Sequence, residues 1–139
     1  MCGIIGISSN KSVSANIINS LKKLEYRGYD SAGVATLFDG EINEVKSEGR
    51  VDNLEQNFDL KSLKGNIGIG HVRWATHGVP NSINAHPHSS DNVSVVHNGI
   101  IENSTILKKH LINKGHTFKS QTDTEVIVHL ITENLKTSE

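Results

Sequence analysis

Short runs of apolar, often β-branched residues recur along the chain between clusters of Ser, Asn, Asp and Gly, and such runs predict strands. The predicted strands occupy residues 2–7, 34–38, 42–45, 67–74, 93–97 and, as a short segment, 117–119. The dipeptide Asp39-Gly40 separates the second run from the third and is typical of a two-residue hairpin turn. The stretches between these runs include two expected loops, at 26–33 and 75–92.

Other segments carry apolar residues three and four positions apart, which predicts helices. The predicted helices start at Ser12 or Ser14, at Asp52, at Glu102 and at Thr122 or Asp123. Ser, Thr and Asp are favoured N-caps because their side-chain oxygens accept from free N–H groups of the first turn. Gly115 is expected to end the third helix. Strands and helices that alternate in this way predict an α+β fold in layers.

Composition and charge exclude several classes of protein. The 139 residues suffice for one ordinary domain, and a formal net charge of −1 argues against binding to nucleic acid or to an anionic membrane. No apolar run approaches the roughly 20 residues that cross a bilayer, and the first run lacks the basic start of a secretory signal. The single cysteine excludes an internal disulfide and a cysteine-rich zinc site. We therefore expect a cytoplasmic protein.

Cys2 carries the most reactive side chain and stands at the front of the first predicted strand. Removal of the initiator methionine would leave Cys2 with the free α-amine, whose pKa of about 7.7–8.0 lets it accept the thiol proton near neutral pH. One residue would then supply both nucleophile and base, and Gly3 would let backbone pack closely beside the sulfur. The plainer interpretation is a small buried residue in a strand.

Three other segments supply groups that suit an amino-acid amide as substrate. Asn98-Gly99 could donate two neutral N–H groups to an oxyanion, Arg73 could grip an α-carboxylate, and Asp123 could accept from an ammonium group. Each has a structural alternative: an Asn-Gly turn, an ordinary ion pair and an N-cap, respectively. Only their combination with a nucleophilic cysteine favours an enzyme.

Six blocks of sequence, in order along nearly the whole chain, carry a resemblance to a known family. They are residues 2–6, 24–33, 71–78, 84–88, 95–103 and 122–127. In these blocks the chain resembles the N-terminal glutaminase domains of glutamine–fructose-6-phosphate aminotransferases, within the class II glutamine amidotransferases. The amino-acid sequences of residues 73–78 and 98–103 favour these aminotransferases over the amidophosphoribosyltransferases and asparagine synthetases of the same class.

The resemblance implies a reaction and assigns its catalytic residues. Cys2 would attack the side-chain amide of glutamine and form a glutamyl thioester, and Asn98 with the Gly99 N–H would hold the oxyanion. Hydrolysis would then release glutamate and ammonia, with no cofactor and no metal. The substrate-binding residues that the resemblance implies are Arg73, Trp74, Thr76, His77 and Asp123, with Arg27 and Asn103 as support around the nucleophile.

The resemblance also implies the αββα sandwich of N-terminal-nucleophile hydrolases, whereas periodicity alone gives only layered α+β. We expect residues 1–139 to be part of a glutaminase domain, incomplete on its C-terminal side and without sugar-isomerase domains. Fructose 6-phosphate would be bound only through those absent domains, and any homo-oligomer would form through the missing region. A retained Met1 would block the amine of Cys2.

Other interpretations stay open at this point. The chain could be a truncated, non-catalytic fragment that only binds glutamine or a partner, or a glutaminase domain of another class II enzyme such as amidophosphoribosyltransferase. Its histidines, including His86 and His88, could bind zinc, although the spacing lacks a helical His pair with a carboxylate. A cysteine–histidine hydrolase would use His77, His86 or His97 as base.

Overall fold

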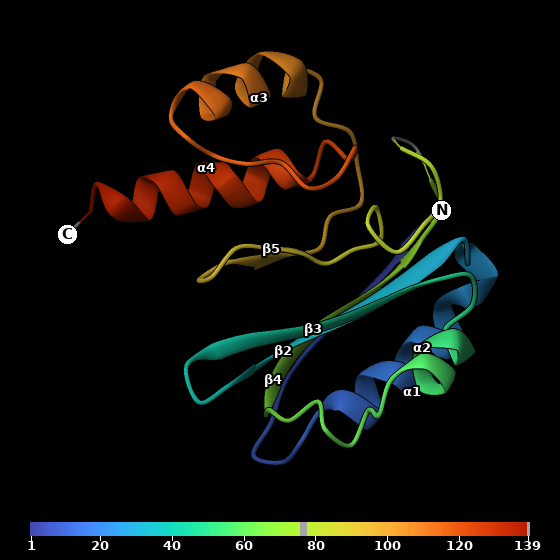
Figure 1. Cartoon of the computed structure of the whole chain (residues 1–139). Coiled ribbons are helices and arrows are strands. Elements are labelled where there is room, and N and C mark those ends of the chain that lie inside the picture. The colour runs from blue at the N-terminus through green and yellow to red at the C-terminus, as the bar shows by residue number, and fades with distance from the viewer. Residues whose placement is uncertain (76–77, 139) are drawn as a thin grey trace.

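The computed structural model describes residues 1–75 and 78–138, which are arranged in four layers (Figure 1). Helices α1 (Ser14–Leu24) and α2 (Asp52–Asn57) cover one face of a four-stranded sheet. A two-stranded sheet lies on the other side, and beyond it come α3 (Ser104–Asn113) and α4 (Glu125–Lys136). This order of helices, sheet, sheet and helices is the expected αββα arrangement.

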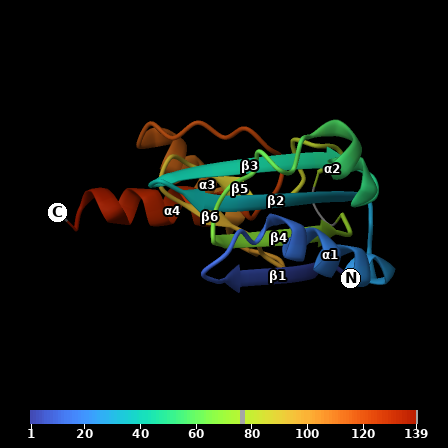
Figure 2. The same ribbon diagram turned by 90° about the horizontal axis from the view of Figure 1, so that it is seen from below.

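The four-stranded sheet is antiparallel throughout and has the order β1-β4-β2-β3 (Figure 2). Its strands are β1 (Gly3–Ser8), β2 (Ser31–Phe38), β3 (Glu41–Glu48) and β4 (Ile67–Arg73). The predicted hairpin joins β2 to β3 at Asp39 and Gly40, whose φ angles of 52° and 76° are both left-handed. Positive φ at both central residues matches the right-handed twist of the strands.

Strand β4 presents different chemistry on its two faces because side chains alternate along a strand. Toward α1 it carries Gly68, Gly70 and the fully buried Val72. A Cβ on either glycine would lie 2.6 Å from a side-chain atom of Ile17, so these glycines let the helix pack directly on the strand. His71 and Arg73 occupy the alternate positions, on the face toward the second sheet.

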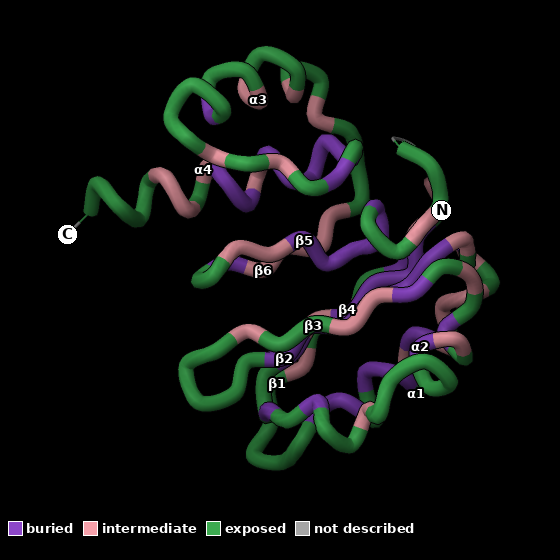
Figure 3. The backbone as a smooth tube through the Cα atoms, in the orientation of Figure 1, coloured by how far each residue is buried: buried purple, intermediate pink, exposed green. Residues whose placement is uncertain are grey.

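The apolar core lies between α1, α2 and the four-stranded sheet (Figure 3). Of the α1 side chains that the 3.6-residue spacing predicts to be internal, Ile17, Ile18 and Leu21 are 0–1% exposed and Leu24 is partly buried. The helix packs against β2 and β4. The fully enclosed members of this core are Val13, Ile17, Ile18, Leu21, Ala32, Val34, Val51, Leu54 and Val72. Burial of this stripe fixes α1 on the sheet.

The second half of the chain forms the thinner pair of layers. Strands β5 (His88–Ser89) and β6 (Ser94–Val95) pair antiparallel, and α4 packs against both. Helix α3 packs on α4 and ends where Gly115 adopts a φ of 94°, as the sequence predicts for the residue after a C-cap.

The two sheets approach most closely where the segment before β5 lies on β2. A Cβ at position 33 would be only 2.0 Å from the carbonyl oxygen of His86, so this contact requires glycine at position 33. Beside it, Lys46 of β3 donates through Nζ to the carbonyl oxygen of Pro87 at 3.2 Å. Contact on both faces explains why the first six residues of β2 are all buried.

Several local predictions are wrong. Residues 31–33 belong to β2 rather than to a loop, only Ser94–Val95 of the run 93–97 forms a strand, and 117–119 is not a strand. The predicted loop 75–92 contains β5. These short strands depend on pairing between distant segments, which local periodicity does not encode.

The predicted N-caps of α1 and α4 are also wrong. Val13 holds the cap position of α1, and no side chain caps that helix end. Instead, the Val13 side chain is fully buried and its N–H donates to Gly65 O at 3.0 Å, so packing fixes the start of the helix. At α4, Thr124 holds the cap position, again without a side-chain cap.

Within the described residues, no helix has the length and apolar character needed to span a bilayer.

Gly33→Ala is expected to destabilise the fold because the new methyl group overlaps backbone rather than a flexible side chain. We expect a loss of about 2–4 kcal/mol in the free energy of unfolding, measured by urea denaturation. Gly6→Ala is the matched control, because its nearest neighbour would be Ile69 Cγ2 at 3.9 Å. That variant should stay within about 0.5 kcal/mol of the parent. Equal effects of the two substitutions would show that the sheets are not packed so closely at Gly33.

Candidate active site

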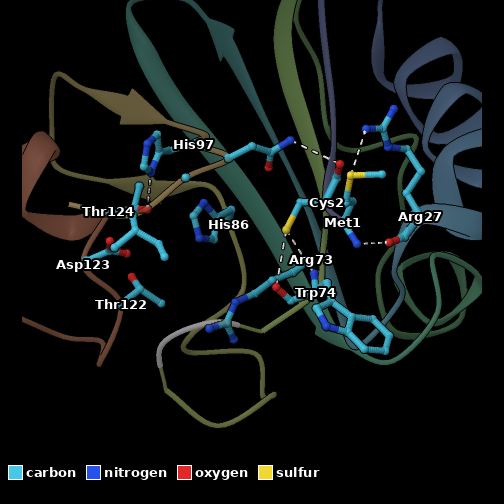
Figure 4. A pocket seen from close by; sticks show the side chains of 13 residues that line it. Met1, Cys2, Arg27, Arg73, Trp74, His86, His97, Thr122, Asp123 and Thr124 are labelled. Carbon is cyan, nitrogen blue, oxygen red and sulfur yellow. Dashed lines mark hydrogen bonds between the residues drawn. The ribbon is translucent and has the colours of Figure 1, made fainter. Parts of the chain in front are cut away.

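A cavity of about 410 Å³ opens between the two halves of the fold (Figure 4). Seven of the residues singled out from the sequence line it: Cys2, Arg27, Arg73, Trp74, Asn98, Gly99 and Asp123. In the close-up, Cys2 and Asp123 lie on opposite sides of the cavity, and Arg73 lies between them. Cys2 and Asp123, which are 121 positions apart in sequence, therefore border one space.

The sulfur of Cys2 is held by the backbone of Trp74. The Trp74 N–H points at Sγ with a separation of 3.1 Å, and Sγ donates to the Trp74 carbonyl oxygen at 3.4 Å. Cys2 is only partly buried, so the sulfur borders the cavity instead of filling the core. Met1 precedes it, with its terminal ammonium donating to Arg27 O at 2.6 Å.

Asn98 reaches across from the segment after β6 to the start of β1. Its Nδ2 donates to the carbonyl oxygen of Cys2 at 3.2 Å, which brings the amide beside that residue. Its neighbour Gly99 also lines the cavity, and a Cβ there would be 2.8 Å from Nε2 of His97. A side chain at position 99 would therefore displace the His97 ring.

Arg73 brings a positive charge into the cavity from the end of β4. Its side chain is almost fully buried, and one guanidinium nitrogen donates to Val79 O at 3.4 Å. Burial lowers the pKa of Arg73, whereas the charges of Asp30, Cys2 and Asp123 act in the opposite direction. A guanidinium stays protonated in proteins, so the cavity contains a fixed cation.

Asp123 supplies the opposite charge from the segment just before α4. Its Oδ2 accepts from the Ile101 N–H at 2.6 Å, and this bond, instead of the predicted cap of α4, fixes the side chain. Thr122 next to it accepts or donates a 2.7 Å hydrogen bond with Nε2 of His88, which ties this segment to β5. A carboxylate and a guanidinium thus line one cavity from different layers.

The other predicted site residues are placed as follows. Arg27 ends a 3₁₀ turn (Glu25–Arg27) and contacts Met1, and the Trp74 indole is 58% exposed at the cavity edge. Asn103 is exposed at the N-cap position of α3 and is not among the cavity-lining residues. Thr76 and His77 lie outside the described residues.

Three histidines, His71, His86 and His88, form a buried column that sequence reasoning missed, because it considered His86 and His88 only as zinc ligands or as a base and gave His71 no role. The rings of His71 and His86 stack with centroids 4.2 Å apart, and His88 meets His86 edge-on at 4.7 Å. His71 could have been found from strand periodicity, since it lies two positions before Arg73 on β4. No three His, Cys, Asp or Glu side chains within 1–75 and 78–138 are arranged to hold a metal ion.

Burial keeps this histidine column neutral. It lowers the pKa of His71 to about 4 although Asn98 and the His97 backbone favour the charged form. It lowers the pKa of His88 to about 3, helped by the nearby charge of Lys46, and it lowers the pKa of His86 as well. The three neutral imidazole rings therefore pack between the two sheets.

Asp30 is a further residue that sequence reasoning did not single out. Its carboxylate accepts from Ser31 Oγ at 2.9 Å and from the Ala75 N–H. Its backbone N–H also donates to Arg73 O at 3.1 Å. Asp30 therefore fixes the backbone on both sides of Trp74, the residue that holds the sulfur of Cys2.

The histidines considered as bases for a cysteine–histidine hydrolase have other contacts. His97 Nδ1 pairs with Thr124 Oγ1 at 3.2 Å, and His86 stacks on His71. The hydrogen-bond partners of the Cys2 sulfur, among the described atoms, are the backbone groups of Trp74.

Comparison with known proteins shows the family of this chain. Residues 58–136 match the glutamine amidotransferase domain family. The glutamine–fructose-6-phosphate aminotransferases of Clostridium acetobutylicum and Bartonella henselae are 59% and 54% identical to this chain over 94% and 98% of its length. The chain spans only 22% of the length of each of these relatives.

Solved structures show the same fold. The glutamine phosphoribosylpyrophosphate amidotransferase of B. subtilis superimposes with a TM-score of 0.80 at 32% identity, over 95% of this chain and 29% of that one. An allosteric regulatory enzyme of purine biosynthesis gives 0.81 at 33% identity, with the same coverage.

The two facing sheets between helix layers, with a cysteine at the start of the first strand, define an N-terminal-nucleophile hydrolase fold. Within this class, the chain belongs to the glutamine amidotransferase domain family. Its sequence is most like the glutaminase portion of the glutamine–fructose-6-phosphate aminotransferases among the relatives described above.

The neutral histidine column makes folding stability depend on pH. The pKa values of His71 and His88 in the folded protein lie below the ordinary 6.5, so the unfolded chain binds protons first as the pH falls. Their stabilising contribution is complete above pH 6.5 and is lost as the pH falls toward 4. Each histidine contributes at most about 1.4 kcal/mol per pH unit to the free energy of unfolding.

Urea denaturation between pH 7.5 and 4.5 tests this expectation. His88→Gln should reduce the slope of unfolding free energy against pH, because one of the protonating rings is gone. His110→Gln, on the exposed face of α3, should leave the slope as in the parent. A parent protein equally stable at pH 7 and pH 5 would contradict a neutral buried column.

Proposed function

We propose that this chain is a glutaminase that hydrolyses the side-chain amide of glutamine with Cys2 as nucleophile. The observation that carries this proposal is the shared cavity, in which the Cys2 sulfur faces a space also bordered by Arg73 and Asp123. Glutamine has an α-carboxylate, an α-ammonium and an uncharged amide. A cation, an anion and a thiol around one cavity match these three groups.

The nucleophile becomes competent once Met1 is removed, because the α-amine of Cys2 is then free. This amine takes the thiol proton while the sulfur attacks the amide carbon, which gives a tetrahedral intermediate. Return of the proton to nitrogen and cleavage of the C–N bond release ammonia and leave a glutamyl thioester. Water, deprotonated by the same amine, then attacks the thioester and releases glutamate and the thiol.

Substrate recognition follows from charge. Arg73 binds the α-carboxylate in a bidentate manner, and Asp123 accepts from the α-ammonium. Thr76 and His77 support the carboxylate end, while Trp74 lies on the rim and Arg27 and Asn103 act as support. Burial of Arg73 and Asp123 strengthens their attraction for a charged ligand relative to exposed groups.

The oxyanion of the tetrahedral intermediate is held by Asn98 and Gly99. The Asn98 amide already lies beside Cys2, since its Nδ2 donates to the carbonyl oxygen of that residue. The Gly99 N–H follows directly in the chain and supplies the second neutral donor. Two preorganised donors stabilise the charge that develops on the former carbonyl oxygen.

We infer that the ammonia is used for amino-sugar synthesis in the cytoplasm. The relatives named above are isomerizing aminotransferases of fructose 6-phosphate, and this chain matches 22% of their length. Residues 1–139 supply the glutaminase part of that reaction, and sugar-isomerase domains supply the site for fructose 6-phosphate. Identities of 54–59% to these enzymes, against 32% and 33% to the two solved structures named above, favour the sugar as acceptor.

Purified protein lacking Met1, verified by intact mass, should release glutamate from glutamine. Incubation with the diazoketone 6-diazo-5-oxo-norleucine should add one adduct at Cys2 and abolish the activity. Cys2→Ala should remove activity while glutamine binding persists, and Cys2→Ser should retain little because a hydroxyl is harder to deprotonate. Processed parent protein that forms no adduct and releases no glutamate would contradict the proposal.

Substitution of Arg73 and Asn98 should separate binding from catalysis. Arg73→Ala should mainly raise KM for glutamine, since its contact with the carboxylate is present in the ground state and the transition state alike. Arg73→Lys keeps the charge without the fork and should be intermediate. Asn98→Ala should lower kcat by about 10²–10³-fold because one oxyanion donor is lost. Steady-state kinetics of glutamate release would refute the carboxylate assignment if Arg73→Ala changed kcat alone.

A further inference from the structure

His71 connects the histidine column to the residue assigned to the oxyanion. It is fully buried on β4, and its Nε2 lies 2.9 Å from Oδ1 of Asn98. Asn98 comes from the other half of the fold, 27 residues further along the chain. The hydrogen bond therefore joins the four-stranded sheet to the segment that follows the two-stranded sheet.

The surroundings of Asn98 determine which atoms donate. A carbonyl oxygen can only accept, so the Cys2 carbonyl, 3.2 Å away, requires the Nδ2 end of the amide to face Cys2. Oδ1 then faces His71 and can only accept, so Nε2 of His71 carries the proton. A flipped amide would place Oδ1 against the Cys2 carbonyl oxygen, and two acceptors would face each other.

The column also fixes the His71 ring itself. The ring stacks on His86 at an interplanar angle of 14°, and His86 in turn meets the ring of His88, which pairs with Thr122. A ring clamped in this way cannot rotate to present its other edge to Asn98 without disturbing the packing between the sheets. Its neutral state leaves one nitrogen as donor and the other as acceptor.

We propose that His71 is a positioning residue for amide hydrolysis: its Nε2–H holds Oδ1 of Asn98, so that the Nδ2 group faces Cys2 and the oxyanion formed there. The amide nitrogen has two hydrogens, and one of them is donated to the Cys2 carbonyl oxygen. The fixed orientation of the amide directs the other hydrogen toward the oxyanion. This inference rests on the proposed glutaminase function. It assigns to a residue outside the cavity lining a role that acts only through Asn98.

Kinetics of three variants test the role. His71→Leu removes the donor and should lower kcat for glutamate release by about 10–100-fold, less than the loss of Asn98 itself, with KM within about twofold. His71→Gln should restore most of the rate, because its side-chain amide N–H can occupy the place of Nε2–H. His71→Asn is too short to reach and should resemble the leucine variant. His110→Gln serves as an exposed control and should match the parent.

A double-mutant comparison separates positioning from general structural support. In an Asn98→Ala background, His71→Leu should lower kcat by no more than about twofold, since the residue it orients is gone. A purely structural role would instead lower kcat by the same factor in both backgrounds, and this result would overturn the proposal.

One readout is independent of activity. Nitrogen-15 NMR of the His71 imidazole in the parent protein should show the Nε2–H tautomer from pH 8 to pH 5. The Nδ1–H tautomer, or a charged ring at pH 6, would overturn the assignment. If the parent protein hydrolysed no glutamine, the proposed function would fail, while the tautomer would still decide whether His71 holds the Asn98 amide.

Discussion

The close approach of the two sheets at Gly33 and His86 is the constraint on which the site depends. Cys2 directly precedes β1 and Arg73 ends β4 of the four-stranded sheet, whereas Asn98 and Asp123 belong to the other half of the fold. Neither half contains a complete set of charged and nucleophilic groups. Only when the backbone before β5 lies directly on β2, at a distance that excludes any Cβ, do these residues border one cavity. A packing contact between layers thus determines how far apart these side chains lie around the cavity.

Buried histidines fill the space between the layers near this contact. Apolar side chains would fill the same volume, yet they could not hold an amide or a hydroxyl in one orientation. A neutral imidazole combines a flat packing surface with a donor and an acceptor on its edge. His71 and His88 use this edge on Asn98 and Thr122, which both line the cavity. The column therefore supports two residues of the cavity lining at once, and acidic conditions weaken it.

The sequence predicted the larger elements well because their apolar spacing is long and regular. Helix α1 and the β2–β3 hairpin have patterns that determine them locally, and the six motif blocks contain every cavity-lining residue except Met1. The sequence failed where structure depends on distant partners. Burial of Val13, not a serine cap, fixes the start of α1. The Asp123 side chain accepts from the Ile101 N–H instead of capping α4. Pairing of β5 with β6 and the stacking of His71 on His86 involve residues that no local pattern relates.

Trp74 combines a hydrogen-bonded backbone with an exposed side chain. Its N–H and carbonyl oxygen hold the sulfur of Cys2, and Asp30 fixes the neighbouring backbone, while the indole extends toward solvent at the cavity edge. The indole can therefore change its surroundings without moving the nucleophile. Because the chain has a single tryptophan, its tryptophan fluorescence comes from one known place beside Cys2. The protein thus carries a built-in optical reporter of events at its own cavity, with no need for an attached dye.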